Sequence, residues 1–125
     1  MATVLDMTAP TAPTLDVEAL RAAPESTFAL AAVLAEDVEW IEVDQRTQPR
    51  SPAVLHGREA VLEMIADAES RGITSRVTDG FAAGDRAALT VTCSYAGGGQ
   101  VLSNALLDLR DGNIVRWFSV QAWDD

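Results

Sequence analysis

The chain has 125 residues, 48% of them hydrophobic and 22% charged, which fits one soluble domain with a single core. Its formal net charge is −10 and its nine Lys and Arg residues are scattered, so nucleic acid and membrane surfaces are not expected as partners, because both require a basic patch. The single cysteine, Cys93, excludes an intrachain disulfide and a cysteine-based zinc site, and the lack of a signal-peptide pattern or a membrane-length apolar run favours a cytoplasmic protein.

The first part of the chain is predicted to be a tail followed by two helices. Residues 1–14 contain the run Thr-Ala-Pro-Thr-Ala-Pro, whose composition disfavours helix and strand, so we expect a flexible tail ahead of a single domain over 15–125. Apolar residues then recur at helical spacing over 15–23, until Pro24 interrupts the pattern. A second helix is predicted over 25–34.

A strand is predicted over 37–44, where the sequence alternates and is rich in β-branched and aromatic residues. Trp40, Glu42 and Asp44 share one face of this strand, because side chains two residues apart point the same way. The polar stretch 45–52 follows with two prolines, and we expect it to form a loop.

Beyond this loop the sequence predicts a helix and then a series of strands. His56 and Gly57 precede a helix over 58–70, whose apolar residues lie on one side. The stretches 73–81 and 86–95 are predicted to be strands, the second more clearly because it alternates over its whole length.

The strongest local signal is a hairpin around Asp111-Gly112-Asn113. An Asp-Gly pair between two alternating segments favours a tight turn between antiparallel strands. Helices therefore come first and an antiparallel sheet dominates the end, which predicts the α+β class. One face of the last strand carries polar groups between two large aromatics, which is typical of a wall of a small-molecule cavity. The residues on that face are Trp117, Ser119, Gln121 and Trp123.

Three segments carry a resemblance to a known family: Leu34-Ala-Glu-Asp-Val-Glu-Trp40, His56-Gly-Arg-Glu-Ala-Val61 and Asp111-Gly-Asn-Ile-Val115. With the order of helices and strands around them, the chain resembles the nuclear transport factor two-like superfamily, and within it the bacterial SnoaL-like and ketosteroid isomerase-like proteins. The resemblance implies a cone-shaped, curved antiparallel sheet wrapped around the N-terminal helices. It also implies a cavity for a small-molecule ligand and a homodimer formed through the outer face of the sheet.

The resemblance implies three chemistries that can be compared with these residues. Ketosteroid isomerases use an Asp base near the end of the first long strand, where Asp44 falls, but the Tyr of their oxyanion hole has no counterpart in the N-terminal helices. Limonene epoxide hydrolase-like members need an Asp where this chain has Ser119, which disfavours epoxide hydrolysis. Polyketide cyclases of the SnoaL type need one acid/base Asp or His, which Asp44 or His56 could supply.

Two residues are therefore predicted to be catalytic. Asp44 is the favoured general base, because it shares a face with Trp40 in a partly apolar cavity; the alternative is a loop cap at the end of the strand. His56 is the only histidine and a side chain suited to proton transfer near neutral pH; the alternative is a surface residue. Glu42 could pair with Asp44 as acid and base, although strand Glu residues are commonly exposed.

The predicted substrate-binding residues come from several strands. An amide or hydroxyl there could hold a carbonyl oxygen as negative charge develops on it. The alternatives are that the aromatic residues are core and that the amides face solvent or a dimer partner. Cys93 is expected to be a small buried residue and not a nucleophile. The binding set comprises Trp40, Glu42, Tyr95, Asn104, Trp117, Ser119 and Gln121.

The favoured function is an acid/base enzyme without cofactor or metal. It would be an isomerase, cyclase or dehydratase acting on a small, largely apolar carbonyl or polyketide-like compound. The alternatives are a non-catalytic binding protein that uses the same cavity and a structural dimerisation module. A carboxylate with a raised pKa inside the cavity would favour the enzyme, and a cavity without a titratable group would favour the binding protein. A cavity filled by side chains would favour the structural module.

Overall fold

The computed structural model describes residues 14–23 and 26–124, and it shows three helices and six strands within them. The flexible tail expected over 1–14 lies outside these residues apart from Thr14, so it stays a prediction. No helix in these two stretches is long and apolar enough to cross a membrane. The elements are α2 (Val17–Ala22), α3 (Ser26–Ala31), β1 (Leu34–Val43), β2 (Ala53–His56), α4 (Arg58–Ser70), β3 (Thr74–Ala83), β4 (Arg86–Ser94), β5 (Gln100–Arg110) and β6 (Asn113–Trp123).

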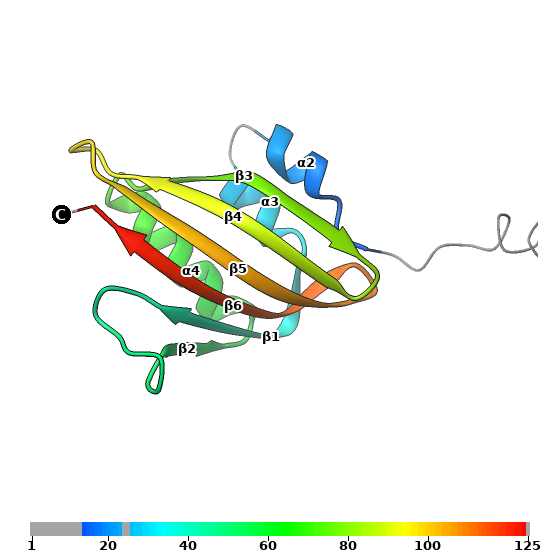
Figure 1. Ribbon diagram of the computed structural model, residues 1–125. Helices are drawn as coiled ribbons and strands as arrows, with labels where there is room; N and C mark the ends of the chain where they lie inside the picture. The colour runs from blue at the N-terminus through cyan, green and yellow to red at the C-terminus, as the bar shows by residue number, and fades with distance from the viewer. Residues whose placement is uncertain (1–13, 24–25, 125) are drawn as a thin grey trace, which may run out of the picture.

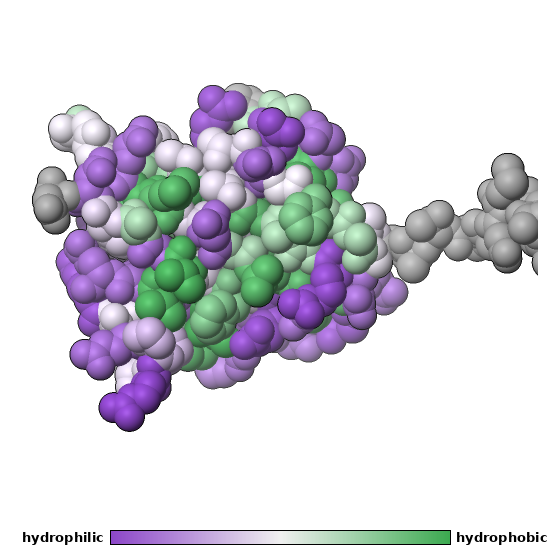
Figure 2. All heavy atoms as spheres, in the orientation of Figure 1, coloured by the Kyte–Doolittle hydropathy of each residue, from purple (hydrophilic) through white to green (hydrophobic). Residues whose placement is uncertain are grey.

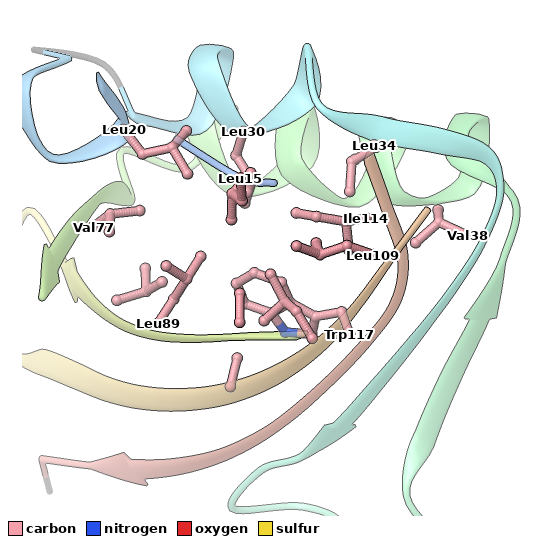
Figure 3. Close-up of a cluster of buried hydrophobic side chains, with 14 of the residues drawn as sticks. Leu15, Leu20, Leu30, Leu34, Val38, Val77, Leu89, Leu109, Ile114 and Trp117 are labelled. Atoms are coloured by element: carbon pink, nitrogen blue, oxygen red, sulfur yellow. The ribbon is translucent and has the colours of Figure 1, made fainter. Parts of the chain in front are cut away.

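The six strands form one curved sheet in the order β2-β1-β6-β5-β4-β3 (Figure 1). Neighbouring strands are antiparallel except for β1 and β6, which run parallel. The helices lie on the concave face, so the sheet curves beneath them and encloses the core (Figure 3). The predicted α+β class, with a curved sheet wrapped around helices, is confirmed, and the parallel pair is a departure from a purely antiparallel sheet.

The hairpin that joins β5 to β6 forms where the sequence predicts it. Asp111 and Gly112 have φ values of 53° and 81°, the left-handed values that a two-residue type I′ turn requires. Arg110 and Asn113 pair on either side of the turn. The Asp-Gly pair thereby sets the register next to the turn, and the register shifts between Leu109 and Asp108 for the rest of the two strands.

β1 starts earlier, and the second helix ends earlier, than the sequence pattern indicates. α3 ends at Ala31, and Leu34 already pairs with Ile114 of β6. Both paired side chains are buried, so tertiary packing outweighs helical spacing there. β2 is absent from the sequence prediction, because a short edge strand with mostly exposed side chains shows no hydrophobic alternation. The helix over 58–70 has the predicted bounds.

The core fills one end of the concave face and leaves the other end open. Leu34, Val38, Leu109 and Ile114 are buried together at the filled end (Figure 3). Inward-facing residues of β5 are buried and most of the intervening ones are exposed, as a strand covered on one face requires. Towards the ends of β1 and β6, side chains do not fill the space between helix and sheet, and a cavity remains.

Gly80 lies where β3 bulges against β4. The register of these strands shifts between Val77 and Asp79, and a Cβ on Gly80 would lie 2.6 Å from the carbonyl oxygen of Ala88. Gly80→Ala is therefore expected to destabilise the fold by about 1–3 kcal/mol in urea unfolding. Gly97→Ala is the control, since its Cβ would meet no atom within 4 Å. Equal losses of stability in the two variants would contradict this packing argument.

Candidate functional site

A cavity of about 410 Å³ lies between α4 and the inner face of the sheet, at the end where β1, β4 and β6 stop. Its volume is within the range of about 300–1,000 Å³ that is usual for small-molecule sites. Met64 and Ile65 of α4 form part of one wall, and the strands form the others. The polar and aromatic members contributed by the strands and their ends are Trp40, Glu42, Asp44, Ser75, Cys93, Tyr95, Ser103, Trp117, Gln121 and Trp123.

All three tryptophans of the chain line this cavity. Trp40 and Trp117 are partners across β1 and β6, and their rings stack with centroids 4.1 Å apart and planes inclined by 5°. Trp123 packs against Tyr95 with ring centroids 5.8 Å apart and planes inclined by 37°. Two pairs of aromatic rings in one cavity favour a flat, largely apolar ligand.

Glu42 is the carboxylate held among these aromatic rings. Its Oε1 accepts a hydrogen bond of 2.6 Å from the indole N–H of Trp40, and Gln121 of the neighbouring strand β6 lines the same cavity. Burial raises the pKa of Glu42 above its ordinary value of 4.5, and the charge of Asp44 adds to this, while the side chains of Trp40 and Gln121 partly oppose it. Glu42 is thus an acid with a raised pKa beside the aromatic rings of a cavity, a combination expected of a proton-transfer group.

Asp44 stands directly after β1, where it lines the cavity and also holds the following loop. Its Oδ1 accepts a 2.8 Å hydrogen bond from the backbone N–H of Arg46. Its own backbone N–H donates to Thr47 Oγ1, also at 2.8 Å. These contacts match the loop cap that was the alternative to a catalytic role. A catalytic role for Asp44 stays a prediction, and the contacts of Glu42 make Glu42 the stronger candidate.

The structure corrects the position expected for His56, which does not line the cavity. His56 ends the edge strand β2 and pairs with Glu39 of β1. Its side chain is 75% exposed, and its Nδ1 lies 3.9 Å from Glu39 Oε2. Residues directly opposite each other on neighbouring strands point to the same face. Because Glu39 faces away from the side that carries Trp40, the pairing turns His56 away from the ligand space.

Asn104 is a second correction, because it lies on the outer face of the sheet. It is exposed, and its Oδ1 accepts a 2.8 Å hydrogen bond from Thr90 Oγ1. The neighbouring Ser103 is buried, lines the cavity and pairs with Gln121. The sequence does not reveal this, because β5 carries apolar residues on both faces and alternation alone cannot orient it. The pairing of β5 with β6 would have identified Ser103, because Ser103 lies opposite Gln121 on the face of β6 that carries Trp117.

The predicted face of β6 does turn inward. Trp117 and Gln121 line the cavity, whereas Ser119 is completely buried between them and does not line it. Ser119 is the partner of Glu42 across β1 and β6, so the smallest side chain on this face lies beside the carboxylate. Among residues 14–23 and 26–124, Ser119 Oγ and Trp117 Nε1 find no hydrogen-bond partner.

The chain matches the sequence model of a known domain family over most of its length. The model of the SnoaL-like domain matches residues 8–117. The chain belongs to the SnoaL-like family. A comparison of this SnoaL-like protein with curated proteins found no match.

Solved structures similar to this SnoaL-like protein show the same NTF2-like fold. An NTF2-like protein of unknown function from Mesorhizobium loti is 25% identical, with a TM-score of 0.62 and coverage of 78% of this chain and 79% of that one. A candidate ketosteroid isomerase from Kribbella flavida is 24% identical, with a TM-score of 0.61 and coverage of 89% and 82%. A protein with a ketosteroid isomerase-like fold from Catenulispora acidiphila, solved in complex with trimethylamine, is 18% identical, with a TM-score of 0.59 and coverage of 85% of each chain.

Cys93 and Tyr95 contribute neutral polar groups to the cavity of this SnoaL-like protein. Cys93 Sγ lies 3.2 Å from Ser75 Oγ, and burial raises the pKa of the thiol, so it remains protonated at neutral pH. This environment disfavours a nucleophilic thiolate, and Cys93 is partly buried at the cavity wall, where the sequence predicted a small buried residue. Burial also raises the pKa of Tyr95, which keeps its hydroxyl available as a hydrogen-bond donor.

Several lining residues of the SnoaL-like cavity were not singled out from the sequence. Arg46, Glu69 and Arg71 add charged groups, and Arg71 is also paired with Asp67 at 2.7 Å. They lie on a loop and at the end of α4, where no periodic pattern marks them as functional. Across residues 14–23 and 26–124, no three His, Cys, Asp or Glu side chains gather as a metal site.

Proposed function

We propose that this SnoaL-like protein is an acid/base enzyme acting on a small, flat and largely apolar carbonyl compound. Glu42 takes a proton from the carbon next to the carbonyl group and returns it elsewhere on the molecule. The observation that supports this proposal is the Glu42 carboxyl group, which is partly buried, has a raised pKa and is held by the N–H of Trp40. A base with a pKa closer to the working pH is the more effective at proton transfer.

The reaction begins when the C–H bond next to the carbonyl breaks and its proton passes to Glu42. The electron pair left on carbon moves into the carbonyl group and forms an enolate. The hydroxyl of Tyr95 lines the same cavity and is a neutral donor that can hold the developing oxyanion. In a substrate with a double bond next to the α-carbon, return of the proton to the far end of that bond gives the conjugated isomer. Attack of the enolate carbon on a second carbonyl group of the same molecule closes a ring, and Glu42 returns its proton to the alkoxide oxygen formed there.

The stacked rings of Trp40 and Trp117 support a flat substrate, because a planar unsaturated molecule can lie against an aromatic surface. They also help to explain the raised pKa of Glu42, since apolar surroundings disfavour the ionised carboxylate. The open cavity disfavours a purely structural dimerisation module, which would fill this space with side chains.

Exchange of the α-protons of β-tetralone in deuterated buffer tests the proposal directly. β-Tetralone is a compact bicyclic ketone with a fused benzene ring, small enough for the cavity, and proton NMR follows the loss of its α-proton signals. The protein is expected to accelerate this exchange above the rate in buffer and above the rate with an equal amount of free glutamate. Exchange no faster than in those controls would contradict the proposed function.

A second candidate function is non-catalytic binding of a small organic ammonium ion in the same cavity. Aromatic rings attract such cations, and the carboxylates of Glu42 and Asp44 would offset the charge. The trimethylamine complex of the Catenulispora protein motivates this candidate. Titration with tetramethylammonium would then saturate a change in tryptophan fluorescence, without any protein-dependent exchange of β-tetralone. Absence of a saturable change would rule this candidate out.

We also propose that two copies of the chain associate through the outer face of the sheet. Apolar side chains gather on this face over β3 to β6 (Figure 2). They surround a shallow groove of about 370 Å³, and contiguous apolar surface of this kind marks association sites. The large exposed members are Phe81, Leu102, Leu106 and Val120, of which Phe81 is 71% exposed.

The cytoplasmic location expected from the sequence remains a prediction.

Leu106→Arg is expected to convert the dimer to a monomer in sedimentation velocity, because it places a charge on the lining of the apolar groove. Ala66→Arg is the matched control, since Ala66 is exposed on α4 on the opposite side of the sheet. The control is expected to leave the dimer intact. A wild-type monomer at concentrations of about 100 μM would exclude a stable dimer.

A further inference from the structure

We propose that Trp123 is a positioning residue for Glu42, which it orients through the side-chain amide of Gln121. The inference rests on the proposed function, in which Glu42 handles the proton. Trp123 and Gln121 lie two residues apart on the inner face of β6, and both line the cavity. Neither touches the substrate through this role, since the effect passes from indole to amide to carboxylate.

The first step is the bond between Trp123 and Gln121. The indole N–H of Trp123 donates to Gln121 Oε1 at 2.9 Å. An indole nitrogen can only donate, so this bond selects the amide oxygen of Gln121 and leaves the amide NH₂ group directed elsewhere. Without such a partner, the two ends of a glutamine amide can exchange places at little cost.

The second step is the contact between Gln121 and Glu42. The two residues line the same cavity from the neighbouring strands β6 and β1, and the Gln121 side chain acts on the Glu42 carboxyl group so that the ionised form is favoured. An ionised carboxylate only accepts hydrogen bonds, so Gln121 must offer its NH₂ group, the end that Trp123 leaves free. Trp40 supplies the other N–H donor, at 2.6 Å. Donors from β1 and β6 thus hold the carboxylate between them.

The position of Trp123 is itself well supported. It is paired with Val101 of β5, and its ring packs against Tyr95. The next residue closes the strand pair, because the N–H of Asp124 donates to the carbonyl of Gln100 at 3.0 Å and Asp124 Oδ2 accepts from the N–H of Gln100 at 2.9 Å. The strand that carries the indole is therefore fixed and the ring packs on Tyr95, so the indole can impose an orientation on the more flexible glutamine.

The two possible orientations of Gln121 have opposite effects on Glu42. With its NH₂ group towards the carboxylate, Gln121 stabilises the charge and lowers the pKa. With its oxygen towards Glu42, it repels the ionised carboxylate and accepts a hydrogen bond from the O–H of the protonated carboxyl group, which raises the pKa. Other charged or titratable groups lining the cavity are Asp44, Arg46, Glu69, Arg71, Cys93 and Tyr95, and the substitutions below leave all of them in place.

A double-mutant cycle with Trp123→Phe and Gln121→Met tests the proposal. The pKa of Glu42 is measured from the carbon-13 shift of its carboxyl carbon, with Glu42→Gln identifying the signal. Each single substitution is expected to raise the pKa of Glu42, and Trp123→Phe should reach at least half the shift of Gln121→Met. In the Gln121→Met background, Trp123→Phe should add nothing, because the amide through which it acts is gone.

Trp40→Phe serves as the control for the cycle. It removes the direct donor to Glu42, so its effect should add to that of Trp123→Phe instead of replacing it. Trp123→Leu provides a second substitution if Trp123→Phe does not fold. An unchanged pKa of Glu42 in the Trp123 variants, or the same shift with and without Gln121, would overturn the proposal. This readout needs no turnover, so failure of β-tetralone exchange would count only against the proposed function.

Discussion

Glu42→Gln is expected to lower the protein-dependent exchange of β-tetralone by about 10²–10⁴-fold. Glutamine has nearly the same shape as glutamate, and its side-chain oxygen can still accept the hydrogen bond from Trp40 Nε1. It cannot take up a proton, so the cavity would keep its form and lose the reaction. Binding of β-tetralone, followed by quenching of the cavity tryptophans, should change little.

Asp44→Asn is the matched comparison, because Asp44 was favoured as the base from the sequence alone. Its carboxylate bonds to the N–H of Arg46, and asparagine can keep that bond through its side-chain oxygen. Most of the exchange activity should therefore remain in Asp44→Asn. Loss of exchange in this variant together with retention in Glu42→Gln would reverse the assignment and make Asp44 the base.

The Glu42→Gln variant should also be the more stable protein at neutral pH. The pKa of Glu42 is raised in the folded state from its ordinary value of 4.5, so the folded protein holds this proton more tightly than the unfolded chain. The stability due to Glu42 is therefore full below about pH 4.5 and is lost as pH rises through the folded-state pKa. Melting temperatures should converge at about pH 4 and separate at about pH 8, with the variant higher.

Trp117→Ala is expected to cost about 3–5 kcal/mol in the free energy of unfolding, measured with urea. Trp117 is 2% exposed and stacks on Trp40 at 4.1 Å, so its removal leaves a large void and uncovers a second aromatic ring. The void left by the Trp117 side chain would connect the cavity with the buried end of the core. We therefore expect the largest loss of stability among the substitutions considered.

Trp123→Ala is the matched control for this prediction, since it removes the same side chain from the same strand. Trp123 is only partly buried and already borders the cavity, so its removal leaves less buried space unfilled. Its loss should be clearly smaller than that of Trp117. Equal losses at the two positions would contradict the view that the stack of Trp40 and Trp117 belongs to the core.

The sequence predicts well the turns and helices that are determined by residues close together in the chain. The Asp111-Gly112 turn needs two left-handed residues, and α4 has one apolar side, so both are visible without tertiary information. The inward face of Trp117 and Gln121 follows from simple alternation. The parallel pairing of β1 with β6 leaves no such local trace, because it joins segments from opposite parts of the chain.

The candidate site was harder to predict, because it depends on which side of the sheet each side chain faces and on how deeply that side chain is buried. Asn104 and Ser103 are neighbours on a strand with apolar residues on both faces, so a shift of one residue exchanges their roles. His56 was misplaced because β2, which turns it outward, was not predicted. The preference for Glu42 over Asp44 rests on contacts with Trp40 and with Gln121 of another strand, which alternation along one strand does not show.

The most direct measurement of the central claim compares two curves on one sample: the rate of β-tetralone exchange against pH and the carbon-13 titration of the Glu42 carboxyl group. If Glu42 is the base, the rate rises with pH as Glu42 ionises. Both curves should then share one midpoint, above 4.5, and the rise should vanish in Glu42→Gln. A rate profile that keeps its midpoint in Glu42→Gln, or that departs from the titration of Glu42, would contradict the assignment of Glu42 as the proton-transfer group.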